Sequence, residues 1–189
     1  MFYPFKVLPR FNQDSHMMRL LLILLTSFVY SSLFAQTMDN RGYVVQKGEL
    51  SPEFEIELLS GDTLSNQSLL GQVVVLQFTA SWCSVCRKEM PHLESEVWQK
   101  FKDDAFLLVG IDLKEDEATT LEFAAKMGVT YPMASDLEGR LFSLFAGPKQ
   151  GVTRNIVINK KGEIIFLTRL YDRAEFEQMI EIIAQELEK

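Results

Sequence analysis

The stretch FTASWCSVCRKEMPHLE, Phe78 to Glu94, contains both cysteines of this 189-residue chain, and a tryptophan comes directly before the first of them. The apolar run VVVLQF (residues 73–78) leads into it and is typical of a strand buried on both faces. Apolar residues then recur at helical spacing and predict a helix with one buried face: Met90, Leu93, Val97 and Phe101. The stretch therefore predicts a strand, a turn and a helix that begins at Cys83.

A cysteine at the start of a helix is activated by the helix itself. Unpaired backbone N–H groups and the helix dipole favour negative charge there, so we expect a lowered pKa for Cys83 and expect this thiol to be the attacking nucleophile. Cys86 lies three residues later on the same face, where it can close a disulfide or release a bound partner. Arg87 and Lys88 add positive charge beside the pair. The spacing thus predicts a reversible, redox-active Cys83–Cys86 disulfide.

Other uses of a cysteine pair fit this chain less well. A zinc site needs about four ligands, and after residue 35 the chain has two cysteines and one histidine, so we expect no metal and no cofactor. Covalent haem attachment needs a histidine where Arg87 stands. His92 should point away from Cys83 as an ordinary helix residue, which argues against a cysteine hydrolase. A permanent structural disulfide stays open, although so short a loop adds little stability.

The first 35 residues differ from the rest of the chain. Met17-Met18-Arg19 leads into an apolar run, Leu20 to Ala35, and this order is typical of a secretory signal peptide. We expect cleavage after Ala35 and export, to the periplasm, with residues 1–16 preceding a translation start at Met17 or Met18. The alternative is an uncleaved membrane anchor, but the run is shorter than the roughly 20 apolar residues of a spanning helix.

The chain that remains is acidic. Removing residues 1–35 leaves 16 basic and 25 acidic residues, a net charge of −9. Such a chain is a poor binder of nucleic acid or of anionic membrane, so we expect neither as a partner. Residues 36–50 are mixed in character and are interpreted as a linker or a loose strand, which leaves residues 51–189 as one domain.

Segments on both sides of the cysteine pair alternate between strand and helix patterns. The order predicts an α/β fold with a central mixed sheet, helices on both faces and an N-terminal β-hairpin. The expected elements, besides those above, are a hairpin with its turn at residues 60–62, a strand over 105–112, a helix that stops at Gly128, a short helix within 137–147, a second hairpin turning at 160–162 and a last helix over about 172–189.

These motifs resemble the thioredoxin superfamily, and most closely its exported TlpA/ResA-like branch, over roughly Ser51 to Lys189. The likeness is carried by SPEFEIELLSGDTLSNQSLLGQVVVLQFTASWCSVCRKEMPHLE and by NIVINKKGEII. The resemblance implies a thioredoxin-like fold and thiol-disulfide exchange, and it places Trp82 where substrate binds. Pro91 matches the proline that bends the first helix of this family.

Glu89 occupies a position where this branch often has an acid close to the thiols. Its spacing of three residues from Cys86 puts the carboxylate beside the deeper thiol, where it can move a proton. Glu89 is therefore a candidate catalytic residue, and the alternative is a solvated helix glutamate.

The sequence departs from the family pattern at three places. Gln77 replaces the buried acid of classical thioredoxins, and Ser84-Val85 replaces their Gly-Pro dipeptide, which leaves the direction of electron flow open. Thr153 stands where thioredoxins have a cis-proline; we expect it to face the dithiol through a trans peptide bond and to bind substrate. Arg154 follows it and is a third candidate substrate-binding residue, since peroxiredoxin-like relatives have an arginine in this region that can stabilise a thiolate. The sequence leaves open whether its side chain lies near Cys83 or faces solvent.

We interpret the chain as an exported thiol-disulfide oxidoreductase that reduces protein disulfides and is kept reduced by a membrane-bound thiol electron donor. Two rivals stay open. One is a peroxiredoxin-like thiol peroxidase in which Cys83 attacks peroxide, and the other is a partner-docking module with a permanent disulfide.

Overall fold

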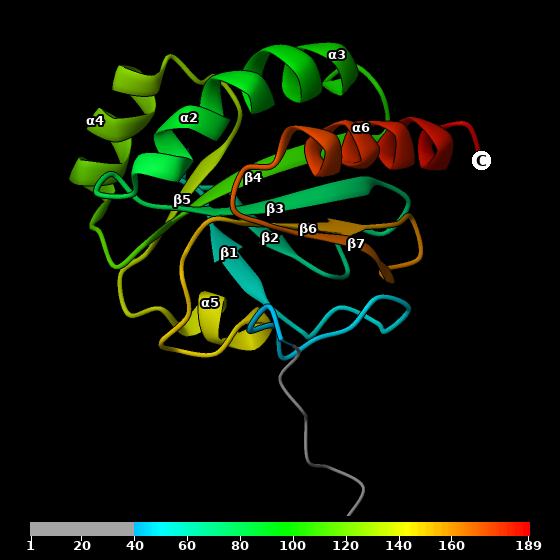
Figure 1. The fold of residues 1–189 in the computed structure, drawn as a ribbon, viewed down its shortest axis with the longest axis horizontal. Coiled ribbons are helices and arrows are strands. Elements are labelled where there is room, and N and C mark those ends of the chain that lie inside the picture. Colours follow the sequence, from blue (N-terminus) through cyan, green and yellow to red (C-terminus); the bar gives the residue numbers. More distant parts are fainter. Residues whose placement is uncertain (1–39) are drawn as a thin grey trace, which may run out of the picture. The chain divides into compact units, whose positions relative to one another are not determined.

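A five-stranded mixed sheet lies at the centre of the structure (Figure 1). The computed structural model describes residues 40–189, so the expected signal peptide and residues 36–39 lie outside the described residues. The strand order is β5-β4-β3-β6-β7; β3 runs parallel to β4 and antiparallel to β6. The strands of this sheet are β3 (Val73–Thr79), β4 (Phe106–Leu113), β5 (Met133–Asp136), β6 (Arg154–Ile158) and β7 (Ile164–Arg169).

Strand β3 forms the middle of the core, as its apolar run predicts. All seven of its residues are buried, because successive side chains point to opposite faces of the sheet and both faces are covered by apolar clusters. Val73 and Val75 pack with Met90 and Leu93 of the first helix. The side chains between them pack on the other face, with the cluster that includes Phe142 and Phe145.

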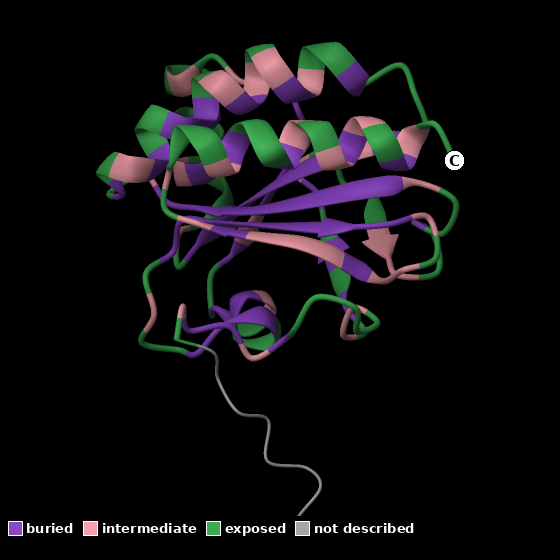
Figure 2. Cartoon of the chain, turned by 45° about the vertical axis from the view of Figure 1, so that its right-hand side comes forward, coloured by how far each residue is buried: buried purple, intermediate pink, exposed green. Residues whose placement is uncertain are grey.

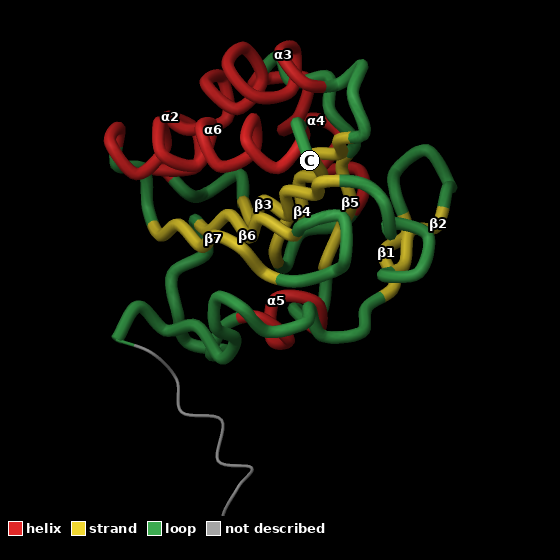
Figure 3. Tube along the Cα trace, turned by 90° about the vertical axis from the view of Figure 1, so that its right-hand side faces the viewer, coloured by secondary structure: helices red, strands yellow, loops and turns green. Residues whose placement is uncertain are grey.

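Helices cover both faces of this sheet, which confirms the predicted thioredoxin-like fold class. Figures 1 and 3 show α2, α3, α4 and α6 over one face and α5 alone over the other. Figure 2 shows the resulting pattern, with a buried sheet and helices that are buried only on their inner sides. The helices are α2 (Ser84–His92), α3 (Gln99–Phe101), α4 (Glu117–Met127), α5 (Arg140–Phe145) and α6 (Arg173–Leu187).

The first helix changes its winding directly after Pro91. Helix α2 ends at His92 and continues as a π-helix, η2 (Leu93–Trp98), before α3. Proline has no N–H to donate and its ring crowds the preceding turn, so the regular hydrogen-bond ladder is interrupted there. The four apolar positions expected to form the inner face of this helix are all buried: Met90, Leu93, Val97 and Phe101.

The helix ends follow the expected signals. Gly128 ends α4 in the left-handed conformation, with φ of 67°, and the Asp172 side chain caps α6 by accepting a hydrogen bond from the Glu175 backbone N–H at 2.9 Å. No helix among residues 40–189 is both long enough and apolar enough to cross a membrane.

Residues 40–50 belong to the domain instead of forming the expected linker. Tyr43 and Val45 are buried in the core, and Tyr43 forms a β-bridge with Ala146 next to α5. Leu50 pairs in the same way with Glu163 at the turn between β6 and β7. Gly42 and Gly48 adopt positive φ angles at bends of this packed segment.

An edge of the sheet contains a strand that the sequence pattern does not predict. Strand β5 has four residues, MASD, and pairs with β4 in parallel. The expected N-terminal hairpin, β1 (Glu55–Glu57) and β2 (Thr63–Ser65), reaches this edge, where Leu58 bridges Ala134. The hairpin thus covers part of an edge that would otherwise present unpaired backbone groups.

Candidate active site

The two cysteines form a disulfide at the N-terminus of α2. Cys83 is the N-cap residue, and its sulfur accepts a hydrogen bond from the Cys86 backbone N–H at 3.1 Å. Cys83 is 8% exposed and Cys86 is fully buried. The pair therefore has an outer sulfur, at the end of the helix where negative charge is favoured, and an inner sulfur that solvent does not reach.

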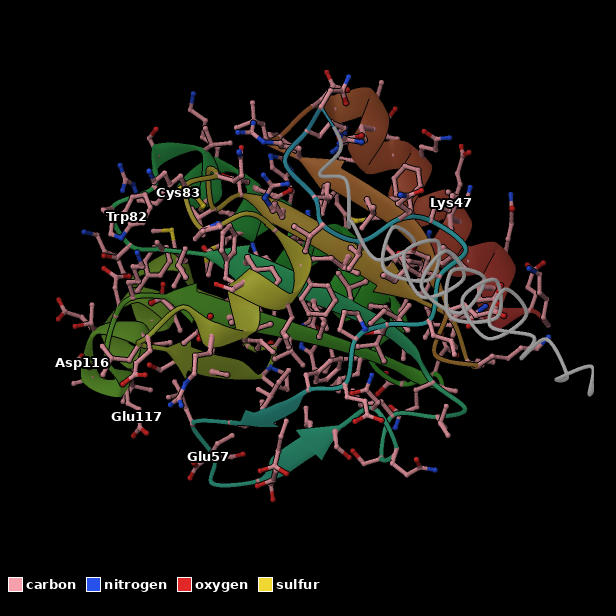
Figure 4. All side chains as sticks on the ribbon, turned by 90° about the horizontal axis from the view of Figure 1, so that it is seen from below. Lys47, Glu57, Trp82, Cys83, Asp116 and Glu117 are labelled. Atoms are coloured by element: carbon pink, nitrogen blue, oxygen red, sulfur yellow. A yellow bond between two sulfur atoms is a disulfide. The ribbon has the colours of Figure 1, made fainter. Side chains whose placement is uncertain are left out.

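Trp82 lies at the surface beside this disulfide. Its side chain is 61% exposed, and Figure 4 shows it next to Cys83 at one side of the molecule. The backbone behind it is a tight turn in which the Cys83 N–H donates to the Ala80 carbonyl at 3.0 Å. A large apolar ring on a defined turn offers contact area to a molecule that approaches Cys83.

Thr153 faces the disulfide from the start of β6. Its hydroxyl oxygen lies 3.2 Å from the sulfur of Cys83 and 3.2 Å from that of Cys86. The peptide bond before it is trans, as expected for a residue other than proline. Thr153 thus presents one hydroxyl group to both reacting atoms.

Arg154, the next residue, has a buried side chain, so the interpretation of a solvent-facing arginine is wrong. Its guanidinium carbon lies 4.4 Å from the centre of the Tyr43 ring. The same group donates to the carbonyls of Gly151, at 3.1 Å, and of Arg41, at 2.9 Å. Arg154 therefore ties residues 41–43 to the loop that leads into Thr153.

Glu89 lies one turn beyond Cys86 and is 1% exposed, so the interpretation of a solvated helix glutamate is wrong. Burial raises the pKa of Glu89 to about 7, although a hydrogen bond from the Asn155 amide to its carboxylate, at 2.8 Å, acts in the opposite direction. A carboxyl group with this pKa both gains and loses a proton near neutral pH.

Two amide side chains on paired strands line the same buried region. Gln77 on β3 lies directly across from Asn155 on β6, and Gln77 accepts a hydrogen bond from the Tyr131 hydroxyl at 2.8 Å. Asn155 also donates to the Thr168 hydroxyl, at 2.9 Å. Gln77 thus takes part in a polar network, although its amide group cannot transfer a proton as a carboxylic acid would.

Asn155 is not among the site residues predicted from the sequence, although the sequence contains a signal that its side chain has a buried partner. It is a polar residue inside the short apolar run NIVI, where an asparagine is uncommon unless its amide finds a buried partner.

His92, by contrast, is where it was expected. Its ring bonds Glu96 at 2.8 Å and stacks on Tyr171, on the side of the helix away from the disulfide.

Comparison with known proteins places this site in a family. The sequence model of the AhpC/TSA family matches residues 48–167. The chain belongs to the AhpC/TSA family. Among its relatives, the thioredoxin-like protein YneN of Bacillus subtilis is 32% identical over 123 residues, which cover 64% of this chain and 71% of YneN.

Other relatives of this chain indicate the chemistry. The thiol-disulfide oxidoreductase ResA of Halalkalibacterium halodurans is 26% identical over 152 residues, 80% of each chain. A solution structure of a proposed protein disulfide isomerase from Bacteroides thetaiotaomicron is 44% identical, covers 80% of this chain and 96% of its own, and superposes with a TM-score of 0.77. With its Cys83–Cys86 disulfide, this AhpC/TSA protein is a thiol-disulfide oxidoreductase of the ResA type, which confirms the predicted activity.

The Thr153 hydroxyl gives a first prediction. Thr153→Val keeps the shape of the side chain and removes the group 3.2 Å from each sulfur. We expect alkylation of reduced Cys83 at neutral pH to slow by roughly three- to tenfold, since a thiolate loses one hydrogen bond. Thr153→Ser, which keeps the hydroxyl, should restore most of the rate. Equal rates in all three proteins would show that the hydroxyl does not act on the thiolate.

Arg154 gives a second prediction, about stability. Arg154→Met should lower the free energy of unfolding by about 2 kcal/mol, because two carbonyl groups lose a charged donor. Arg140→Met is the matched control: that side chain is 84% exposed, so its replacement should change the free energy by less than about 0.5 kcal/mol in the same urea titration. Equal effects of the two substitutions would contradict the anchoring role of Arg154.

Proposed function

We propose that this protein is exported and reduces disulfides in other proteins. The observation that carries the proposal is the asymmetry of the pair: Cys83 is 8% exposed at the start of α2, and Cys86, three residues before the buried Glu89, is fully buried. The apolar run before Ala35 supports export. An oxidising compartment requires a source of electrons, so the reduced state would be renewed by a membrane-bound thiol donor.

The proposed reaction transfers two electrons in two exchanges. The Cys83 thiolate attacks one sulfur of the substrate disulfide; a mixed disulfide forms, and the other substrate sulfur leaves as a thiolate and takes up a proton. The Cys86 thiol gives its proton to Glu89 and attacks Cys83, so the first substrate sulfur leaves in turn and takes up a proton. The substrate ends as a dithiol, and the protein ends as the disulfide seen here.

Three other side chains have proposed roles around this reaction. Trp82 would contact the substrate chain, because its ring is exposed beside Cys83. The Thr153 hydroxyl would donate a hydrogen bond to the Cys83 thiolate. Arg154 would act indirectly, by fixing the loop before Thr153, and this departs from the thiolate contact considered from the sequence.

Trapping tests the proposal. Cys86→Ser leaves the attacking thiol and removes the one that resolves the mixed disulfide, so the reduced variant should hold oxidised proteins covalently and release them with dithiothreitol. Reduction of insulin by the wild-type protein should be faster than by a monothiol at equal concentration. Neither result is expected of a permanent disulfide, and fast turnover of hydrogen peroxide in place of insulin would favour the peroxidase.

A further inference from the structure

Ser81, at the start of the turn that carries Trp82 and Cys83, links this turn to two other parts of the chain. The Glu115 carboxylate accepts two hydrogen bonds from it, one from the Ser81 backbone N–H at 2.7 Å and one from its hydroxyl at 2.5 Å. Arg87 donates to the Ser81 carbonyl at 2.5 Å. All three polar groups of Ser81 are therefore bound, and two of them depend on one carboxylate from the loop between β4 and α4.

A second acid lies beneath this carboxylate. Asp112, near the end of β4, is fully buried, and neither of its carboxylate oxygens has a hydrogen-bond donor among residues 40–189. Two neighbouring polar groups act on the pKa of Asp112: the Glu115 carboxyl group and the Thr120 hydroxyl. That hydroxyl already donates its hydrogen to the Asp116 carbonyl, at 2.9 Å. An unprotonated Asp112 would therefore be a buried charge that no group stabilises.

The strands on both sides of Asp112 bring no charge to it, and Arg87 at the start of α2 is bound to the Ser81 carbonyl. The partners of Asp112 in the sheet are Thr79 on β3 and Ser135 on β5, and both are uncharged. The Ser135 hydroxyl is committed to the Glu115 backbone carbonyl, at 2.6 Å. Glu115 is a charged neighbour that acts on Asp112, and two neighbouring carboxyl groups attract each other only when they share a proton.

We propose that Asp112 is a positioning residue for the redox site: its protonated carboxyl donates to Glu115 and holds Glu115 as the double acceptor that fixes Ser81. A carboxylate has about four acceptor positions, so Glu115 can bind Ser81 twice and still accept from Asp112. The functional importance of Asp112 rests on the proposed function, because the turn that it positions is the one that presents Cys83 to a partner.

The state of Asp112 then depends on pH. Burial, followed by the nearby Glu115, raises the pKa of Asp112 to about 8. At neutral pH the proton stays on Asp112 and the turn is held. Above about pH 8 the proton leaves, the two carboxylates repel each other, and the bonds to Ser81 weaken.

The Ser81 backbone N–H is a direct probe, because it bonds to the Glu115 carboxylate itself. Its NMR chemical shift would be followed in the oxidised protein from about pH 6 to about pH 10. The wild-type signal should move with a midpoint near 8. Asp112→Asn, whose amide donates as the protonated acid does, should lose this transition. Glu117→Gln removes an exposed acid nearby, labelled in Figure 4, and should keep it.

Exchange activity gives a second measurement. Relative to wild type, Asp112→Asn should reduce insulin at an equal rate at about pH 7 and roughly fivefold faster above about pH 9, where only the wild-type turn loosens. The proposal is overturned if Ser81 does not titrate or if the transition persists in Asp112→Asn. The NMR experiment needs no turnover, so it remains informative even if the protein reduces no protein disulfide.

Discussion

Replacing Cys83 by serine is expected to abolish disulfide exchange, with a loss on the order of a thousandfold or more in the rate of insulin reduction. The reason is access: Cys86 is fully buried, so it cannot take over the first attack from the 8%-exposed Cys83. Cys86→Ser should instead keep a fast first attack and stop at the mixed disulfide. The two serine variants thus separate the steps, and rapid alkylation of Cys86 in Cys83→Ser would contradict the assigned roles.

This pair of variants also distinguishes a redox centre from a structural staple. The loop that the disulfide closes is among the shortest possible, so its loss constrains the unfolded chain little. Each serine variant should therefore melt within a few degrees of the oxidised wild-type protein, which keeps the disulfide. A large fall in melting temperature without any exchange activity would favour the permanent disulfide.

Replacing Glu89 by glutamine is expected to make the protein more stable at alkaline pH and slower as a catalyst. Burial raises the pKa of Glu89 from 4.5 to about 7, so between these values the folded protein holds a proton that the unfolded chain releases. The free energy of unfolding must then fall as pH rises through this window. Glutamine has no such proton and still accepts from Asn155, so Glu89→Gln should be more stable by on the order of 3 kcal/mol at about pH 8.

The measurement is a set of urea titrations at several pH values for the two proteins. Their free energies of unfolding should agree below about pH 4 and diverge up to about pH 7, where the folded carboxyl titrates. The raised pKa of Asp112 also makes the free energy of unfolding fall as pH rises. This fall is the same in both proteins, so it cancels when one free energy is subtracted from the other. Asp136→Asn would not serve as a control, since that carboxylate caps α5. Parallel curves for wild type and Glu89→Gln would contradict a buried, protonated Glu89.

Much of the fold follows from local signals that need no partner. The run at residues 73–78 becomes the central strand because nothing polar interrupts it except Gln77, and Gly128 stops α4 because its backbone has positive φ. Strand β5 carries no such signal. It is four residues long, follows a proline and mixes polar with apolar side chains, so only its pairing with β4 makes it a strand.

In the site, too, some positions follow from local sequence and others only from the tertiary fold. The places of Cys83, Cys86 and Glu89 follow from their spacing, because residues three apart at the start of and along a helix are neighbours. Asn155 reaches Glu89 across 66 residues of chain and Glu115 reaches Ser81 across 34, so both contacts arise from sheet pairing and loop packing. Local signals do not place residues 40–50 in the domain for a related reason: the aromatic ring of Tyr43 packs against Arg154, which lies far away in the sequence.

Three consecutive residues, the one directly before strand β6 and its first two, contact three different surroundings. Thr153 meets the sulfurs, Arg154 turns to Tyr43 on one side of the sheet, and Asn155 turns to Glu89 on the other. Because side chains alternate along a strand, one inserted or deleted residue just upstream would exchange these assignments together. Engineers of this scaffold should therefore treat residues 151–155 as a single unit of fixed length.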